Sequence, residues 1–425
     1  MTRVSILPHL KNIKPSATLF LNERTQRLIA QGRNVYRLGF GQSPFPVPEE
    51  VVQALQTSAH QKNYLPVKGL PALRKAVAAY NRKTLALECG PENILIGPGS
   101  KELLLGLQMA TDADLLLPTP SWVSYEPQAQ IARKKVIWLE TEERNKWLLT
   151  ADQLDQACKR LKARPKMLLL NYPNNPVGST YEPDELGKLA VVAREHQVVV
   201  IADEIYGALE FTGTHHSLAQ YYPEGTIISA GLSKWCGAGG WRLGTFTFPD
   251  ECIHLLQAMA TIASESFSAV STPVQYAAVR AFEGSEVINR YLELSRRILH
   301  VLAQYVYHEL IAHQVTMPAP EGGFYLFPNF NAYRSALIKR EIFTSTTFCE
   351  HLLEETGVAL LPGEAFGRPE NEYTCRLAFV DFDGGVALAA AGKDLSTALD
   401  ESFIRIHCPL VHEGIARLCD WLEGL

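Results

Sequence analysis

One lysine and one arginine stand in a run of very small residues, and they are the first candidates for chemistry. The stretch Thr226–Gly244 opens with an apolar, β-branched run that is typical of a buried strand. Lys234 follows among glycine, alanine and serine residues, and Arg242 comes shortly after. An amine in such a place can bond a carbonyl, and a guanidinium can bind a phosphate. The pattern indicates a pyridoxal phosphate (PLP) pocket; the alternative is a glycine-rich turn with a structural lysine and arginine.

Three further candidates also follow predicted strands. The turn Gly97–Glu102 leads into a helix, whose free backbone N–H groups form an anion site. In Asn171–Gly178, prolines flank Asn174 and Asn175 and fix the direction of an amide. Asp203 follows the most apolar run of the chain, so we expect this buried acid to need a cationic partner; helix capping is the alternative. Tyr206 shares a face with Asp203 if a helical turn begins there.

The elements that position these residues alternate between strands and helices. Apolar runs of strand length alternate with amphipathic patterns, which predicts a mainly parallel sheet covered by helices on both faces. Ligands of such sheets bind at the carboxyl ends of the strands. We expect strands at residues 94–96, 114–117, 136–139, 167–170, 198–201 and 227–228, and helices at 48–59, 70–84, from about 100, from about 121, 152–162 and 183–196.

The two ends of the chain have a different pattern. A helix is expected over 16–31 and a short strand over 35–42, followed by closely spaced prolines that mark a domain crossing. Beyond residue 249 we expect helices at 250–314, the longest near 285–313, then strands at 323–327, 358–361 and 375–380, helices at 345–356 and 409–424, and an inserted loop or helix at 384–398. The sequence predicts a large domain over 46–289 and a smaller α+β domain made of 1–45 with 290–425.

Composition excludes several classes of protein. The chain has 425 residues with a formal net charge of −5, which argues against nucleic acid and anionic membranes as partners. No apolar run is long enough to span a bilayer, and the N-terminus lacks the apolar block of a signal peptide. The eight cysteines form no paired motif, so we expect neither disulfides nor a metal site, and a cytoplasmic location.

The order of the motifs is more specific than any one of them. Pro-Asn-Asn-Pro-x-Gly, Asp-Glu-x-Tyr, Ser-Lys and Gly-Trp-Arg-Leu-Gly follow one another, with Asn175, Asp203 and Lys234 among them. In this set the chain resembles the class I/II aminotransferases, PLP enzymes of fold type I similar to aspartate aminotransferase. The resemblance runs from Pro15 to the last helix. It implies a mainly parallel α/β large domain with a smaller α+β domain.

The resemblance also assigns roles in catalysis. Lys234 is expected to hold PLP as a Schiff base and to move a proton between the substrate and the cofactor. Asp203 is expected to pair with the ring nitrogen, while Tyr206 and Asn175 bind the phenolic oxygen of the ring.

Other positions match residues that bind the cofactor or the substrate. Trp122 is expected to stack on the ring, although a core tryptophan is the alternative. Arg376 is expected to bind the substrate α-carboxylate, and Gly41 to let the backbone approach the substrate. The phosphate is assigned to Gly99, Ser100, Lys101, Ser233 and Arg242.

Tyr64 matches the family tyrosine that reaches the phosphate of the partner subunit. The resemblance therefore implies a homodimer with shared active sites, in which small amino acids and 2-oxo acids are the other partners. Exposing Tyr64 and Leu65 on a monomer would leave apolar surface uncovered.

The expected activity is transfer of an α-amino group between an L-amino acid and a 2-oxo acid. A PLP-dependent C–S lyase, or an enzyme of the ACC synthase type that eliminates from Cβ or Cγ, remains the alternative. Gly231 stands where the family often has serine, which removes one phosphate donor, and the loops at 41–46 and 379–385 depart from the family pattern. These departures leave the preferred side chain open.

Overall fold

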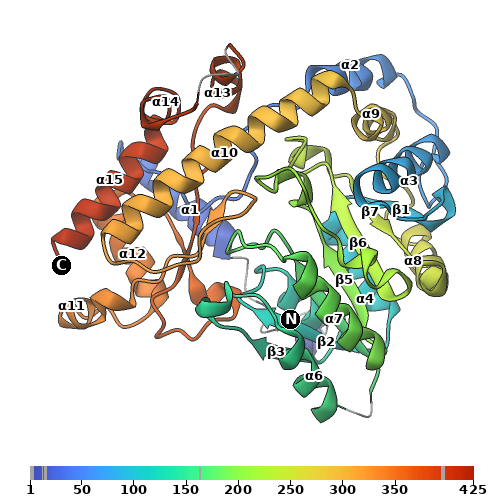
Figure 1. Cartoon of the computed structure of the whole chain (residues 1–425), viewed down its shortest axis with the longest axis horizontal. Helices are drawn as coiled ribbons and strands as arrows, with labels where there is room; N and C mark the ends of the chain where they lie inside the picture. The colour runs from blue at the N-terminus through green and yellow to red at the C-terminus, as the bar shows by residue number, and fades with distance from the viewer. Residues whose placement is uncertain (1–3, 12, 14–16, 162–163, 394–397) are drawn as a thin grey trace.

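A seven-stranded sheet forms the centre of the larger part of the molecule (Figure 1). The computed structural model describes residues 4–11, 13, 17–161, 164–393 and 398–425. The strand order is β1-β7-β6-β5-β4-β2-β3, and β7 alone among these strands runs antiparallel to its neighbours. The strands are β1 (Ile94–Gly97), β2 (Asp114–Thr119), β3 (Val136–Glu140), β4 (Lys166–Asn171), β5 (Val199–Asp203), β6 (Thr226–Gly231) and β7 (Gly244–Thr247).

Helices cover both faces of this sheet because successive strand residues point to opposite sides. On β5, Ile201 packs in the cluster that includes α4, α5 and α8, whereas Val200 and Ala202 pack in the cluster that includes α6 and α7. The helices of this part are α2 (Glu49–Ser58), α3 (Pro71–Leu85), α4 (Ser100–Ala110), α5 (Tyr125–Ile131), α6 (Ala151–Arg160), α7 (Pro183–Glu195), α8 (Ile253–Ser264) and α9 (Thr272–Glu283).

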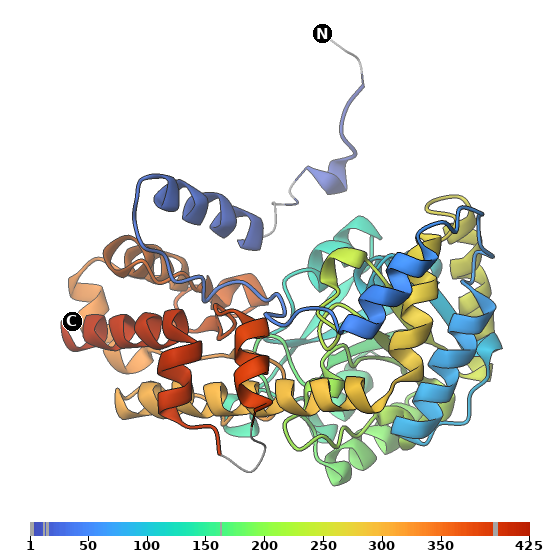
Figure 2. The same cartoon turned by 90° about the horizontal axis from the view of Figure 1, so that it is seen from above.

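A smaller α+β part is built on a three-stranded antiparallel sheet in the order β8-β10-β9. The long helix α10 (Glu286–Ala312) runs from the large part to this one, and α1 (Ala17–Ala30) lies on the outer side of the smaller part (Figure 2). Its strands are β8 (Tyr325–Leu326), β9 (Leu361–Pro362) and β10 (Cys375–Ala378). The remaining helices are α11 (Arg334–Lys339), α12 (Ser345–Thr356), α13 (Gly384–Ala391), α14 (Glu401–His407) and α15 (Pro409–Glu423).

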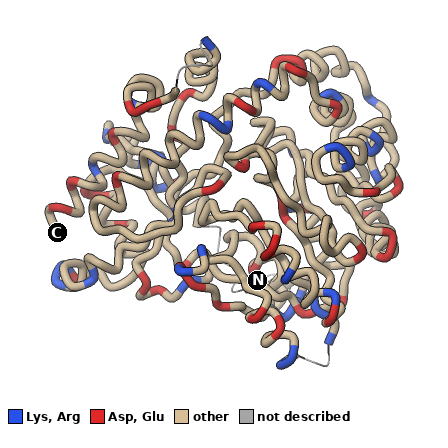
Figure 3. The backbone as a smooth tube through the Cα atoms, viewed as in Figure 1, with Lys and Arg blue, Asp and Glu red and all other residues tan. Residues whose placement is uncertain are grey.

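Acidic and basic residues are interspersed along the chain in the view of Figure 3. In the part of the chain that the structure describes, no helix has the length and apolar character needed to cross a membrane. The described residues also hold no group of three or more His, Cys, Asp or Glu side chains arranged to bind a metal. All eight cysteines are free.

Most predicted elements are confirmed, and the errors have physical causes. The six predicted strands of the large sheet and the helices between them are present. The predicted strand at 35–42 is wrong: this segment makes a single bridge from Tyr36 to Val358 and is otherwise irregular. The strands expected at 323–327 and 358–361 are present only as two-residue strands, Tyr325–Leu326 and Leu361–Pro362, each of which pairs with β10 at two positions. Ser16 and part of the inserted segment lie outside the described residues; the rest of the insertion forms α13.

Strand β7 has no counterpart among the predicted strands, and it determines the position of a candidate loop. Gly244 pairs with Gly97 on one side and with Gly231 on the other. A Cβ atom built on Gly244 would lie 2.2 Å from the backbone nitrogen of Ser100. This close approach allows the turn at Gly99-Ser100 to rest directly on the sheet, which only glycine at position 244 permits.

We therefore expect Gly244→Ala to displace the Gly99-Ser100 turn and to weaken PLP binding by about tenfold or more, which corresponds to one lost strong hydrogen bond. The measurement is a titration of the protein, freed of cofactor, with PLP. Gly240→Ala is the matched control, because Gly240 is exposed and nothing lies within 4 Å of a Cβ built there. Equal affinity in the two variants would contradict the proposed constraint.

Candidate active site

The carboxyl ends of five parallel strands bring the predicted residues together. The turn after β1 carries Gly99 and Ser100, the segment after β4 carries Asn175, and β5 ends at Asp203. Trp122 follows β2, and Lys234 follows β6. This edge is where parallel sheets bind ligands. Arg376 reaches the same place from β10 of the smaller sheet, so the site lies between the two parts of the molecule.

Lys234 is a partly buried amine held by a backbone carbonyl. Its Nζ donates a hydrogen bond to the carbonyl oxygen of Gly41 at 2.8 Å. The same atom lies 5.5 Å from the ring centroid of Tyr206 and 5.7 Å from that of Phe324. Burial, followed by the positive charge of Arg376, lowers the pKa of Lys234 to about 8, and the carboxylate of Asp203 opposes this change. A substantial fraction of the amine is therefore neutral near physiological pH, as a nucleophile requires.

Asp203 is 3% exposed and receives hydrogen bonds from two hydroxyls. Tyr125 donates to Oδ2 at 2.6 Å, and Ser229 donates to Oδ1 at 2.9 Å. Burial raises the pKa of Asp203 to about 6, although these hydrogen bonds lower it in part. The expected cationic partner is absent, since no ion pair joins Asp203 to a side chain among the described residues. A protonated ring nitrogen of PLP fits this buried carboxylate.

The turn before α4 and the loop after Lys234 form an anion cradle. Gly99 has a φ of +89°, and no side chain caps the N-terminus of α4, so the first N–H groups of the helix remain available to an anion. A Cβ on Gly99 would lie 2.2 Å from Nη2 of Arg242. Arg242 itself has a φ of +55°, an unfavourable conformation that directs its guanidinium to this turn. Ser100 and Ser233 are partly buried beside it. These groups fit a phosphate.

Lys101 and Trp122 lie together next to this cradle. The Nζ atom of Lys101 is 5.0 Å from the ring centroid of Trp122, within the range of a cation–π contact. Trp122 packs edge-on against Tyr125 at a centroid distance of 5.1 Å, and Tyr125 in turn bonds Asp203. Burial, and then the charge of Arg242, lowers the pKa of Lys101. A chain of contacts thus runs from the cation of Lys101 through Trp122 and Tyr125 to the carboxylate of Asp203.

Arg376 is a buried guanidinium without a carboxylate partner among the described residues. Nη1 donates to Oδ1 of Asn175 at 3.1 Å, and Nη2 donates to the carbonyl oxygen of Gly39 at 2.8 Å. Its Nε atom is buried and makes no hydrogen bond. The guanidinium also lies over the ring of Tyr325, with Cζ 4.7 Å from the centroid. An unpaired, preorganised guanidinium is suited to binding a carboxylate.

Several residues of the site were missed by sequence reasoning. Tyr125 and Ser229 bind Asp203, and Tyr325 lies against Arg376 and Tyr206. Tyr125 stands three residues after Trp122, at the spacing of one helical turn, and this spacing is the signal that could have found it. Ser229 is found only through the pairing of β5 with β6, where it is the partner of Asp203.

Among the predicted site residues, Tyr64 lies apart from the others in this chain. It is 94% exposed, and it makes no hydrogen bond to the other candidates within the described part of the chain. The neighbouring carbonyl of Asn63 accepts a hydrogen bond from Thr272 at 2.8 Å, which attaches the loop to the start of α9.

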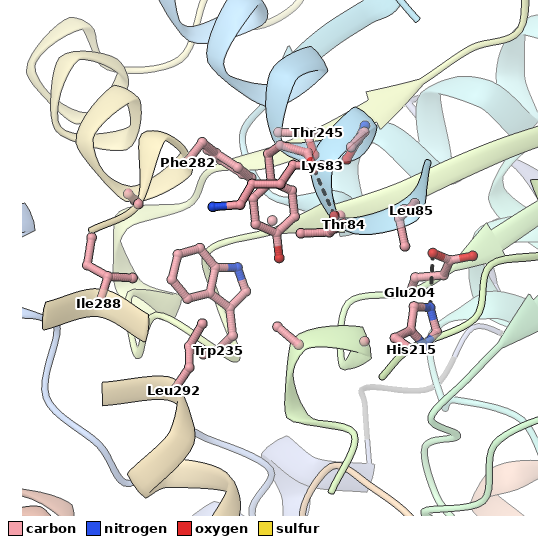
Figure 4. Close-up of a pocket in the computed structure, with 18 of the residues that line it drawn as sticks. Lys83, Thr84, Leu85, Glu204, His215, Trp235, Thr245, Phe282, Ile288 and Leu292 are labelled. Carbon is pink, nitrogen blue, oxygen red and sulfur yellow. Dashed lines mark hydrogen bonds and ion pairs between the residues drawn. The ribbon is translucent and has the colours of Figure 1, made fainter. Parts of the chain in front are cut away.

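A second cavity lies behind the loop that carries Lys234 (Figure 4). Its volume is about 480 Å³, and Trp235 forms one wall together with Phe282, Ile288 and Leu292. Its far end holds a buried pair in which Nε2 of His215 lies 3.0 Å from Oε2 of Glu204. Lys234 does not line this cavity, which is therefore distinct from the candidate active site.

The lowered pKa of Lys234 predicts a pH-dependent stability of the protein freed of PLP. Protonated Lys234 destabilises the folded chain below pH 8 by roughly 1–3 kcal/mol, and this penalty disappears as the pH rises from about 8 to the ordinary value of 10.5. Lys234→Met should therefore melt at a higher temperature than the wild-type protein at pH 7, and the difference should shrink toward pH 10.

Thermal unfolding followed by circular dichroism from pH 6.5 to 10 measures this difference. Lys83→Met serves as the control, because Lys83 is an exposed lysine on α3. Melting temperatures that differ equally at all pH values would show that the charge of Lys234 carries no such penalty.

Comparison with known proteins agrees with this geometry. The family model for aminotransferase class I and II matches residues 33–380. An aspartate aminotransferase of Geobacillus stearothermophilus is 34% identical over 379 residues, which cover 87% of this chain and 93% of that protein. An asparagine–oxo-acid transaminase of Streptococcus mutans is 32% identical over 385 residues, 87% of this chain and 94% of that one. The structure matches that of a Thermus thermophilus aspartate aminotransferase double mutant with a TM-score of 0.84 and 26% identity, over 98% of this chain and 99% of the other.

Three observations indicate the same family: the mostly parallel seven-stranded sheet, the lysine that follows β6, and the extent of these matches. The chain belongs to the class I and II aminotransferases and is a PLP-dependent transaminase, which moves an amino group between an amino acid and a 2-oxo acid.

Proposed function

We propose that the enzyme transfers the amino group of a dicarboxylic amino acid such as aspartate, with Lys234 as the residue that bonds PLP and carries the proton. The observation that carries the proposal is that Lys234, which donates to the carbonyl of Gly41, lies close enough to Asp203 and to Arg376 for both charges to act on its amine. An elimination enzyme of the lyase type is not favoured, because the similar proteins are named as aminotransferases.

Each side chain has a task that its position supports. Bound PLP supplies an electron sink for the carbanion that transamination requires. Asp203 keeps the ring nitrogen protonated, and Tyr206 and Asn175 bind the phenolic oxygen. Arg242 holds the phosphate with the turn at Gly99-Ser100 and with Ser233, while Trp122 covers the ring. Arg376 binds the α-carboxylate beside Gly41, and the amine of Lys234 moves the proton at the substrate Cα.

The substrate side chain is assigned through Lys101. Its ammonium lies over the Trp122 ring, and the charges of Lys101 and Arg376 both act on the Lys234 amine, so two cations lie near the reacting group. Two cations near that amine suit a substrate with two carboxylates. Several similar proteins carry the name aspartate aminotransferase, which supports the same class of substrate. Lys101 then binds the side-chain carboxylate of the substrate in place of the phosphate.

Lys101→Met separates the two roles of this lysine. If Lys101 binds the substrate, kcat/KM for aspartate should fall by about 10- to 100-fold, the size of one charge-assisted hydrogen bond, while that for alanine stays nearly unchanged. Single-turnover absorbance changes with each donor measure this ratio. A phosphate role predicts instead that PLP affinity and the rates with both donors fall together, and that result would contradict the substrate assignment.

We also propose a homodimer in which Tyr64 reaches the phosphate of the partner subunit. The support is its exposure of 94% in the single chain, beside the partly buried Leu65. A phenol next to a dianion forms a strong charge-assisted hydrogen bond, and a twofold interface gives both sites the same donor.

Subunit exchange tests the shared site. Lys234→Ala subunits, which are inactive, are mixed with Tyr64→Phe subunits, which are weakened. Mixed dimers then contain one site with native Lys234 and native Tyr64, so activity should exceed that of either parent. Size-exclusion chromatography with light scattering verifies the dimer, and differently tagged subunits verify exchange. Verified exchange without a gain in activity, or a monomer at assay concentration, would refute the proposal.

Two further features remain proposals. The domain division at 46–289 is supported by the two separate sheets, although its later boundary falls inside α10. A cytoplasmic location is supported by eight cysteines that stay free as thiols.

A further inference from the structure

Tyr325 has no role in the scheme above, yet it contacts Tyr206 and Arg376, to which roles have been assigned. It lies on β8 and is 1% exposed. Its hydroxyl is 2.9 Å from the hydroxyl of Tyr206, to which we assigned the phenolic oxygen of PLP. Its ring lies against the guanidinium of Arg376, to which we assigned the α-carboxylate. Tyr325 thus touches one residue assigned to the cofactor and one residue assigned to the substrate.

The hydroxyl of Tyr325 also has a second acceptor within reach. It lies 3.5 Å from the carbonyl oxygen of Gly41, which already accepts the hydrogen bond of Lys234 at 2.8 Å. A Cβ atom on Gly41 would lie 1.9 Å from this hydroxyl, so glycine at position 41 leaves the space that the hydroxyl occupies. A phenol has a single hydrogen to donate. The Tyr325 hydroxyl therefore donates either to the Tyr206 hydroxyl or to the Gly41 carbonyl, whose second lone pair stays available beside Lys234.

Arg376 is therefore connected to Asn175 and Tyr206, the two residues assigned to the phenolic oxygen of PLP. It bonds Asn175 directly at 3.1 Å, and it reaches Tyr206 through the ring and hydroxyl of Tyr325. Its Nε atom is buried and makes no hydrogen bond, so it can donate to a bound carboxylate. The Tyr325 ring packs against the guanidinium in an enclosed space, so a change in the guanidinium on binding is passed to this ring.

Tyr206 is suited to respond to such a change because its hydroxyl is a hydrogen-bond donor. Burial, and then the neighbouring Tyr325, raises the pKa of Tyr206 well above its usual value, so its phenol stays protonated. Its single hydrogen can point toward PLP only when it does not point toward the hydroxyl of Tyr325, which lies within hydrogen-bond distance. In that arrangement the Tyr325 hydroxyl donates to the Tyr206 oxygen.

We propose that Tyr325 is a positioning residue that couples carboxylate binding at Arg376 to the orientation of the Tyr206 hydroxyl, and so to the protonation of bound PLP. The proposal rests on the roles of Arg376 and Tyr206 given under the proposed function. It adds a second route, through two tyrosines, to the direct contact between Arg376 and Asn175.

The test follows the visible absorbance of bound PLP against pH, with and without saturating succinate. Succinate is a dicarboxylate that has no amino group to transfer, so the readout is spectroscopic and independent of turnover. Succinate should shift the midpoint of the wild-type titration. Tyr325→Phe keeps the ring against Arg376 and removes only the hydroxyl, so it should retain less than about half of this shift, the remainder passing through Asn175.

Tyr373→Phe is the matched control. Tyr373 is also a buried tyrosine of the smaller part, but its hydroxyl donates to the carbonyl oxygen of Ile342 at 2.7 Å, apart from the site. This variant should keep the full shift. Tyr206→Phe removes the same hydrogen bond from its other end, and adding Tyr325→Phe to it should cause little further loss. Melting temperatures of all variants verify their folding.

The outcomes separate this inference from the function on which it rests. A wild-type succinate shift in Tyr325→Phe overturns the inference, provided that Arg376→Gln abolishes the shift. If Arg376→Gln also keeps the full shift, the carboxylate role of Arg376 is wrong, and the inference fails with it. A reduced shift in Tyr325→Phe together with a full shift in Tyr373→Phe supports the coupling.

Discussion

Three cations of the site are held in place by carbonyl oxygens of the backbone. Lys234 donates to Gly41, Arg242 to Gly239, and Arg376 to Gly39. A carbonyl fixes the direction of a cation without neutralising it, whereas a carboxylate would cancel the charge that must bind an anionic cofactor and substrate. The need to bring backbone this close explains why glycines surround the site.

This arrangement makes the empty site electrostatically unfavourable and the filled site favourable. Like charges and burial lower the pKa of Lys234, and burial raises the pKa of Asp203. Each group is therefore displaced toward its neutral form while it lacks a partner of opposite charge. An anionic phosphate, a cationic ring nitrogen and a substrate carboxylate supply the missing partners. The sheet contributes by ending five of its strands at the same edge, so that these groups converge without long loops.

Much of this fold could be predicted from sequence, because the large sheet is buried on both faces and its strands are plain apolar runs. Lys234, Asp203 and Asn175 could be singled out as candidates because each follows such a run. Strand β7 was missed because it is only four residues long and Phe246 is its single apolar side chain. The hydrogen bonds from Tyr125 and Ser229 to Asp203 depend on strand register and on helix placement, which no local sequence pattern reveals. No cationic side chain pairs with Asp203 among the described residues. A protonated ring nitrogen of PLP fits that place, and a sequence does not show which groups a cofactor provides.

The length of α10 has a mechanical consequence. Its 27 residues form a rod of about 40 Å with no break, and its first turns line the cavity behind Trp235. Farther along, it packs against α13, α14 and α15. A rotation of the smaller part relative to the larger one would therefore involve this shared helix, whose first turns border the cavity of about 480 Å³.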